Sequence, residues 1–135
     1  HMIDFCILGS GIAGSTIAKL LSKKYSVQVF DKAKGVGGRT SNKRLKKNLS
    51  FDHGAQYISP KSIKFKKFIE SEIKKKIIKK WEGNHLDFTF KRKDTAPKYI
   101  GIKGNNDLSK YQLKGVKFSL DSQIVKIEFK KIFGK

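Results

Sequence analysis

The chain has 135 residues, of which 38% are apolar, so it is long enough to bury one modest core and its composition argues against intrinsic disorder. Its net charge of +20 raises nucleic acid or an anionic membrane as partners. The sequence has no apolar stretch of the roughly 18 residues that a membrane-spanning helix needs. Its single cysteine, Cys6, excludes an intrachain disulfide.

The positive charge comes almost entirely from lysine, since only Arg39, Arg44 and Arg92 are arginines. Arginine is the side chain that reads base edges in a bidentate manner, and the lysines are spread over most of the chain. A genome-wide bias toward lysine and isoleucine also produces such a charge. We therefore expect weak, salt-sensitive and nonspecific binding to nucleic acid, with no specific nucleic-acid partner and no membrane partner.

The N-terminal residues do not resemble a secretory signal. They lack a basic segment, and the apolar run ends at Gly9. We therefore expect a cytoplasmic location. His1 precedes Met2, so we expect His1 to be an added residue outside the natural chain.

The first thirty residues predict one βαβ unit. Residues 3–8 are typical of a short buried strand, and Cys6 is expected to be buried within its apolar run at residues 5–8. Residues 12–24 carry apolar side chains at helical spacing, and residues 27–30 form a second apolar run that ends at Asp31. Strand, glycine turn, helix and strand within about 30 residues are typical of a Rossmann-type unit.

A loop and a second helix are expected next. Residues 32–50 are polar and contain glycines, so we predict a loop. Ser59 and Pro60 are suited to the N-cap and the first position of a helix. The apolar stripe predicted on this helix consists of Phe65, Phe68, Ile69, Ile73, Ile77 and Trp81.

The rest of the chain predicts short strands and one short helix. Alternating apolar residues over 86–90 predict a half-buried strand, and residues 99–102 another. Asn106 or Asp107 is expected to cap a brief helix ending near Tyr111. Residues 116–120 and 124–129 predict two strands joined by a polar turn. The predicted fold is α/β, with a Rossmann-type βαβ core and appended antiparallel strands.

The sequence Gly-Ser-Gly-Ile-Ala-Gly over 9–14 follows the first strand and opens the first helix. In this context Gly9 permits a tight turn, Gly11 lets the backbone approach a pyrophosphate, and Gly14 lets helix and strand pack closely. The start of the helix offers unpaired N–H groups to phosphates. We therefore predict that a dinucleotide binds to Gly9, Ser10, Gly11, Ile12, Ala13 and Gly14.

Asp31 stands 20 residues after Gly11, where an acid accepts hydrogen bonds from ribose hydroxyls. Its carboxylate would repel the 2′-phosphate of NADP, although the adjacent Lys32 weakens that argument. A second glycine segment follows at Gly37-Gly38-Arg39, ahead of Thr40. The glycines free the backbone to pass close to a ligand, and Arg39 is expected to reach its phosphates. Lys32, Gly38 and Thr40 are also expected to bind the cofactor.

Four segments together resemble the flavin-containing amine oxidase superfamily, above all its renalase-like branch. They are the glycine turn 9–14, Asp31, Gly37-Gly38-Arg39 and the Phe-Asp-His-Gly-Ala-Gln-Tyr sequence at 51–57. The resemblance implies that the cofactor is FAD, with NAD as the alternative. It also implies that four residues lie near the isoalloxazine or the chain next to it: Gly54, Ala55, Gln56 and Tyr57.

The resemblance runs over nearly the whole chain. Trp81 at the end of the long helix fits it, and so does Tyr99-Ile100-Gly101 followed by the sequence at 104–108. The strand around Ile124 resembles one whose backbone meets the adenine. Members of the superfamily are usually more than twice this long, so the resemblance implies an incomplete FAD-binding domain over residues 2–135 that holds the ADP end.

Three hypotheses follow. The first is a short or truncated FAD-dependent oxidoreductase, whose catalytic residues stay unknown because the flavin performs the chemistry. The second is a non-enzymatic nucleotide-binding or interaction remnant, and the third is a basic nucleic-acid-binding protein. Since residues 124–129 would form an open strand edge, we expect either a homo-oligomer or a complementing chain.

No other chemistry is indicated. His53 beside Asp52 is expected to make a loop hydrogen bond, and His85 to lie at the surface. Together with His1 they show no metal-ligand spacing, so no metal is predicted.

Overall fold

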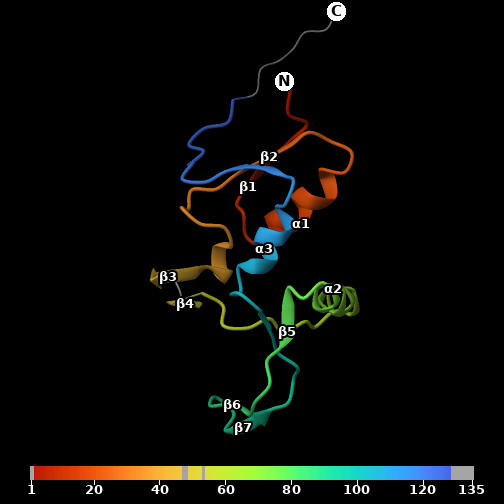
Figure 1. Ribbon diagram of the computed structural model, residues 1–135, viewed down its shortest axis with the longest axis vertical. Coiled ribbons are helices and arrows are strands. Elements are labelled where there is room, and N and C mark those ends of the chain that lie inside the picture. Colours follow the sequence, from red (N-terminus) through yellow and green to blue (C-terminus); the bar gives the residue numbers. More distant parts are fainter. Residues whose placement is uncertain (1, 47–48, 53, 129–135) are drawn as a thin grey trace, which may run out of the picture.

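The computed structural model describes residues 2–46, 49–52 and 54–128 (Figure 1). It is a mixed α/β fold, as predicted. In chain order the elements are β1 (Phe5–Leu8), α1 (Ile12–Leu21), β2 (Val27–Phe30), the 3₁₀ helix η1 (Gly38–Thr40), β3 (Asn42–Lys46), β4 (Leu49–Asp52), α2 (Ile63–Lys74), β5 (Ile78–Lys80), β6 (His85–Asp87), β7 (Arg92–Asp94), β8 (Tyr99–Gly101), α3 (Asp107–Gln112) and β9 (Lys117–Ser119).

A parallel three-stranded sheet in the order β1-β2-β9 contains the predicted βαβ unit. In its register Ile7 pairs with Val29 of the central strand, and Val29 pairs with Phe118. Helix α1 connects β1 to β2, ending at Leu21 rather than at residue 24. The N–H groups of Lys24 and Tyr25 both donate to the Leu21 carbonyl, which turns the chain toward β2.

Two apolar clusters form the core. The first lies between the parallel sheet, α1 and α3, and the second joins α2, β5 and α3. Burying one such aliphatic side chain contributes roughly 1.5–3 kcal/mol. The buried members are Ala18, Val27, Val29, Val36, Leu113 and Val116 in the first cluster, and Ile58, Ile69, Ile78 and Leu108 in the second.

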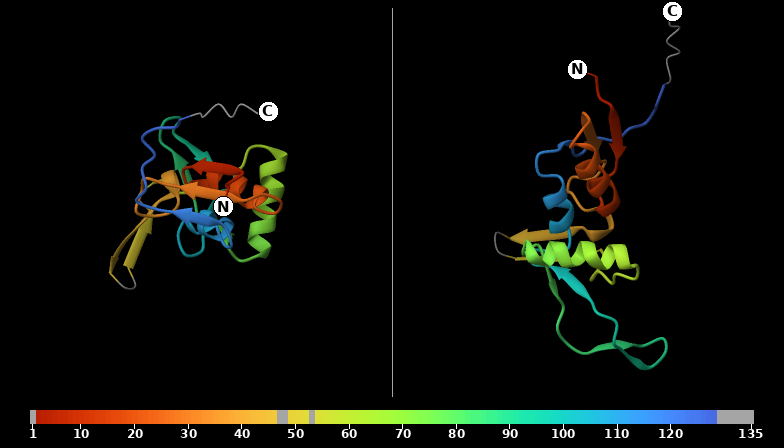
Figure 2. Two further views of the ribbon diagram at one scale, coloured as in Figure 1. Left: turned by 90° about the horizontal axis from the view of Figure 1, so that it is seen from above. Right: turned by 90° about the vertical axis from the view of Figure 1, so that its right-hand side faces the viewer.

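Three antiparallel pairs complete the fold: β3 with β4, β5 with β8, and β6 with β7. Figure 1 shows the β6–β7 hairpin at the end of the molecule opposite the parallel sheet. Figure 2 shows α2 running across the direction of α1 and α3. The candidate site lies where the parallel sheet, α1 and α2 meet.

The predicted loop over 32–50 was wrong. It contains η1, all of β3 and the start of β4, and β3 pairs with β4 so that Asn42 lies opposite Asp52. The Asn42 amide donates to the Asp52 carboxylate over 3.1 Å. The apolar pattern of the hairpin is short, since β3 has Leu45 alone and β4 has only Leu49 and Phe51, and all three side chains stay exposed.

The second helix begins later and ends earlier than predicted. Its N-cap is Ser62, whose hydroxyl accepts a hydrogen bond from the Phe65 N–H over 3.2 Å, so Ser59 and Pro60 lie outside the helix. The helix ends at Lys74 because Lys76 has a positive φ of 58°. Ile77 and Trp81 therefore do not extend the apolar stripe.

The predicted strand over 86–90 is present only at residues 86 and 87, in β6. It is not half-buried, because Leu86 is 64% exposed, and Phe88 and Phe90 lie in the β6–β7 turn and are 85% and 66% exposed. Residues 123–128 form no strand, and Phe129 lies outside the described residues. Cys6 is exposed, since β1 is an edge strand. The strand at 99–102, the short helix and the strand at 116–120 are confirmed as β8, α3 and β9.

Candidate functional site

The glycine turn lies between the end of β1 and the start of α1. Gly9 has φ 102°, a value that L side chains rarely adopt, and a Cβ there would meet no atom within 4 Å. A Cβ on Gly14 would lie 2.0 Å from the Gly9 carbonyl oxygen, so the helix packs on the turn only with glycine. Gly11, the N-cap of α1, provides no side-chain cap, which leaves the N–H groups of the first turn available to a ligand.

The second glycine segment lies directly beside the first. Gly11 and Gly37 form a parallel bridge, and the Gly37 N–H donates to the Ser10 carbonyl over 3.2 Å. Gly37 and Gly38 have φ of 128° and 54°, both in the region that favours glycine. The two glycine segments, which the sequence predicts as parts of one site, are thus brought together.

Asp31 follows β2 and turns toward the glycine turn. Its Oδ2 accepts hydrogen bonds from the Ser10 N–H over 2.6 Å and the Ser10 hydroxyl over 2.5 Å, and its Oδ1 accepts from the Ala33 N–H over 2.9 Å. Burial acts to raise the pKa of the Asp31 carboxyl, but these hydrogen bonds outweigh it, and the pKa lies below its ordinary value. The carboxylate is therefore charged at neutral pH.

An apolar cleft of about 1030 Å³ opens between the glycine segments, α1 and α2. The exposed side chain of Arg39 lies on its wall. We refer to it as the dinucleotide cleft. Its lining residues are Leu8, Gly9, Gly11, Ile12, Ala13, Gly14, Thr16, Ile17, Leu20, Gly37, Arg39, Thr40, Ala55, Ser62, Lys64, Phe65 and Phe68.

The cleft includes half of the residues predicted to bind the cofactor. Eight line it, whereas the other eight do not. The lining residues are Gly9, Gly11, Ile12, Ala13, Gly14, Arg39, Thr40 and Ala55; the others are Ser10, Asp31, Lys32, Gly38, Gly54, Gln56, Tyr57 and Ile124. Of the second group, Ser10, Gly38, Gly54 and Gln56 adjoin lining residues in the chain.

The segment 54–57 reaches the cleft at Ala55. The Ala55 N–H donates to the Arg39 carbonyl over 2.6 Å, and a Cβ on Gly54 would lie 2.1 Å from that oxygen. Asn105 holds the segment from the other side, because its Nδ2 donates to the carbonyls of Ala55 and Gln56 over 2.7 and 2.8 Å. Sequence reasoning did not assign a role to Asn105; its only signal was its place in the 104–108 stretch.

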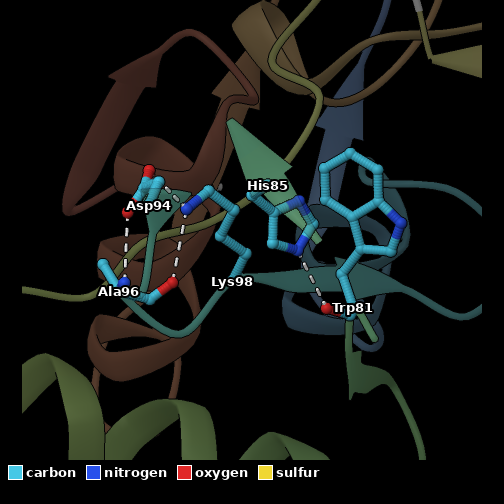
Figure 3. A network of polar contacts seen from close by, with 5 residues as sticks. All are labelled: Trp81, His85, Asp94, Ala96 and Lys98. Atoms are coloured by element: carbon cyan, nitrogen blue, oxygen red, sulfur yellow. Dashed lines mark hydrogen bonds and ion pairs between the residues drawn. The ribbon is translucent and has the colours of Figure 1, made fainter. Parts of the chain in front are cut away.

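Gln56 and Tyr57 line a separate hollow of about 330 Å³, which we call the second cleft. Lys98 also lines this hollow and is 4% exposed. Its ammonium lies 2.6 Å from the Asp94 carboxylate and 3.3 Å from the Ala96 carbonyl, contacts that are drawn in Figure 3. The Lys98 ammonium also lies 5.1 Å from the centre of the Tyr57 ring. The buried cation is thus balanced within the cleft itself.

His85, expected at the surface, is half-buried beside Trp81. Its Nε2 lies 3.3 Å from the Trp81 carbonyl oxygen, to which it donates (Figure 3). The hydrogen bond from Lys98, followed by that from the Ala96 N–H, holds the pKa of the Asp94 carboxyl below its ordinary value. His53 lies outside the described residues.

Within the described residues, no three His, Cys, Asp or Glu side chains are grouped so that they could hold a metal ion. None of the helices in that part of the chain is long and apolar enough to cross a membrane.

The fold and the glycine segments define a Rossmann-like α/β domain. Residues 7–71 match the family model of the NAD(P)-binding Rossmann-like domain. This range contains Ile7 and Leu8 of β1, all of α1 and β2, and both glycine segments. The match therefore includes every residue that lines the dinucleotide cleft.

Two curated relatives match the N-terminal part. An uncharacterized protein of Methanocaldococcus jannaschii is 40% identical over 53 residues, covering 39% of this chain and 14% of the relative. The flavin-containing amine oxidase A of Equus caballus is 39% identical over 61 residues, covering 44% of this chain and 12% of the relative. The matches thus span a small part of either relative.

Two solved structures of putrescine oxidase match part of the chain. A double mutant from a redesign of cofactor binding matches at 28% identity and a TM-score of 0.48, covering 62% of this chain and 18% of that one. The wild type bound to putrescine matches at 24% identity and a TM-score of 0.46, covering 68% of this chain and 21% of that one.

Proposed function

We propose that the dinucleotide cleft binds FAD through its ADP part, and that the chain is the cofactor-binding portion of an amine oxidase-like or renalase-like oxidoreductase. One observation carries the proposal: two glycine segments meet at the N-terminus of α1 beside the exposed Arg39. Similarity to a flavin-containing enzyme over 61 residues supports flavin over nicotinamide.

The residues of the cleft fit a pyrophosphate. Gly9 has open space where a side chain would stand, so a ligand can approach the backbone of the turn. The first N–H groups of α1 would donate to one phosphate, and the Arg39 guanidinium would pair with the other. When bound, FAD supplies the redox chemistry by taking a hydride from a reduced carbon of the substrate.

Asp31 is proposed to accept a ribose hydroxyl. Its Oδ2 already binds Ser10, so a ribose hydroxyl would share or replace the Ser10 hydroxyl as donor. The charged carboxylate would also repel the 2′-phosphate of NADP, even with Lys32 next to it in the chain. NAD is the alternative cofactor, and a nucleotide-binding remnant without enzyme activity is the alternative function.

We also propose that another chain covers β1. This strand lies at the edge of the parallel sheet, and its Phe5 and Leu8 are exposed, as are Ile17 and Leu20 of α1. Open strand edges beside apolar side chains tend to recruit a further strand. β1, like β9 at the other edge of this sheet, is thus open, whereas the described residues 123–128, part of the segment where the sequence predicts the open edge, form no strand.

Calorimetry with FAD, ADP, NAD and NADP at one salt concentration tests the cofactor assignment. We expect FAD and ADP to bind, NADP to bind more weakly, and bound FAD to show the flavin absorbance bands. Arg39→Ala should weaken FAD and ADP binding, whereas Arg92→Ala, an equal change of charge on β7, should not. Absence of FAD and ADP binding by the unaltered chain would contradict the proposal.

A further inference from the structure

We propose that Asn105 and Asn106, consecutive residues at the start of α3, are positioning residues that each fix one wall of the dinucleotide cleft. Neither side chain lines the cleft. The consequence for ligand affinity rests on the proposed function, whereas the positioning itself rests on contacts within the chain.

Asn105 fixes the wall formed by Ala55. It is 1% exposed, and its Nδ2 donates to the carbonyls of Ala55 and Gln56 over 2.7 and 2.8 Å. Its Oδ1 accepts from the Gly101 N–H over 2.9 Å, and its own N–H donates to Asp52 Oδ1 over 2.9 Å. Because both the Oδ1 and the Nδ2 of this buried amide form hydrogen bonds, the side chain has a single orientation and holds the accepting carbonyls in place.

The contact continues from Ala55 to Arg39. The Ala55 N–H donates to the Arg39 carbonyl over 2.6 Å, and Gly54 allows the two backbones to approach. Because the Arg39 side chain lines the cleft, a shift of Ala55 displaces the base from which the guanidinium extends. Asn105 therefore acts on the cleft through Ala55 and Arg39.

Asn106 fixes the wall formed by Gly37. Its Nδ2 donates to the buried Val36 carbonyl over 3.2 Å, across 70 residues of sequence. A Cβ on Gly37 would lie 2.6 Å from the Asn106 Cβ, so these residues are packed closely. The Gly37 N–H in turn donates to Ser10 in the glycine turn over 3.2 Å. The neighbouring side chains of Asn105 and Asn106 thus bind two loops that are distant from each other in the sequence.

Amide hydrogen exchange without ligand tests the positioning directly. Asn105→Ala should increase exchange at the Ala55 amide by about tenfold or more and leave Gly37 little changed, the scale of one or two lost hydrogen bonds. Asn106→Ala should do the opposite. Ser109→Ala is the matched control: Ser109 is equally buried on α3, and its hydroxyl has no hydrogen-bond partner among the described residues.

Coupling to Arg39 tests the consequence for binding. Asn105→Ala should weaken ADP binding about tenfold in the unaltered chain but only about twofold in an Arg39→Ala background, because residues that act through one another are not additive. Ser109→Ala should change affinity by less than twofold in both backgrounds. Should Asn105→Ala fail to fold, Asp52→Ala leaves the Asn105 side chain in place and removes the acceptor that its N–H shares with the Asn42 amide. The same pattern is then expected at smaller size.

The outcomes separate the two proposals. Absent ADP and FAD binding together with the crossed exchange pattern would overturn the proposed function and keep the positioning role. Equal exchange increases at Ala55 and Gly37 in both variants would show general loosening and overturn the positioning role. Additive losses for Asn105→Ala and Arg39→Ala would overturn the path through Arg39.

Discussion

The Asp31 carboxylate accepts two hydrogen bonds from Ser10, one from its backbone N–H over 2.6 Å and one from its hydroxyl over 2.5 Å. The pair joins the end of β2 to the middle of the glycine turn across 21 residues. An acid at this position therefore has a structural task in addition to the ribose contact that the sequence predicts. The two tasks can be separated by substitution.

Asp31→Ala should lower both stability and affinity. It leaves the buried Ser10 N–H and hydroxyl without an acceptor, at a cost of about 1–3 kcal/mol in the free energy of unfolding. FAD or ADP binding should weaken by a similar amount if the ribose uses this carboxylate. Ser10→Ala is the control, since it removes one donor and leaves the carboxylate available. Urea unfolding and calorimetry give the two quantities, and unchanged affinity in Asp31→Ala would remove this residue from the site.

The contribution of Asp31 to stability should depend on pH. Its pKa is lower in the folded chain than in the unfolded chain, where it is about 3.9. The stabilisation is therefore fully present above about pH 5 and is lost as the pH falls through the folded pKa. The difference in unfolding free energy between the unaltered chain and Asp31→Asn should be constant from about pH 5 to 8 and shrink below about pH 4. A difference that grows toward low pH would contradict this assignment.

The sequence predicted the βαβ unit well because its evidence is local. Val27–Phe30 is a buried strand next to a glycine turn, and the structure has the strand at these bounds. The β3–β4 hairpin was missed because β3 is polar except for Leu45, and the apolar alternation in β4 is limited to Leu49 and Phe51. Ile77 and Trp81 keep helical spacing with Phe65, yet the left-handed Lys76 ends the helix before them.

Within the site, the sequence predicted the glycine turn and the second glycine segment, because each is recognised from residues that are adjacent in the chain. It did not predict that Asp31 turns toward Ser10, nor that Asn105 reaches Ala55, because both contacts join residues far apart in the chain. Ile124, exposed and outside the cleft, shows the same limit. Its predicted role depended on a strand that the described residues 123–128 do not form.

Arg39→Lys should restore only part of the affinity that Arg39→Ala loses. A guanidinium can hold two phosphate oxygens in a planar, bidentate manner, whereas an ammonium provides a single point of charge. Calorimetry with ADP on the three proteins measures the difference, which we expect to be about 1 kcal/mol between arginine and lysine. Full recovery with lysine would show that charge alone matters.

Nucleic-acid binding should be independent of sequence and sensitive to salt. The charge of +20 is carried mainly by lysines, which attract phosphates without reading bases. Unrelated DNA duplexes should bind with similar affinity, and that affinity should collapse between about 50 and 200 mM salt. Fluorescence anisotropy with two duplexes over this salt range is sufficient. A tenfold preference for one sequence at physiological salt would favour the nucleic-acid hypothesis instead.

The open edge at β1 should make the isolated chain self-associate. Cys6 lies exposed on this edge strand, and the neighbouring Leu8 is 53% exposed, so the edge combines unpaired backbone groups with apolar side chains. A lysine at an edge discourages pairing, so Cys6→Lys should shift sedimentation and light scattering toward the monomer. Phe88→Lys is the control, because it adds the same charge and removes a larger exposed apolar side chain in the β6–β7 turn. If Phe88→Lys shifts the chain toward the monomer as much as Cys6→Lys does, self-association depends on net charge or on nonspecific apolar contacts and not on β1. A monomer at high concentration that keeps FAD through gel filtration would contradict the need for any covering chain.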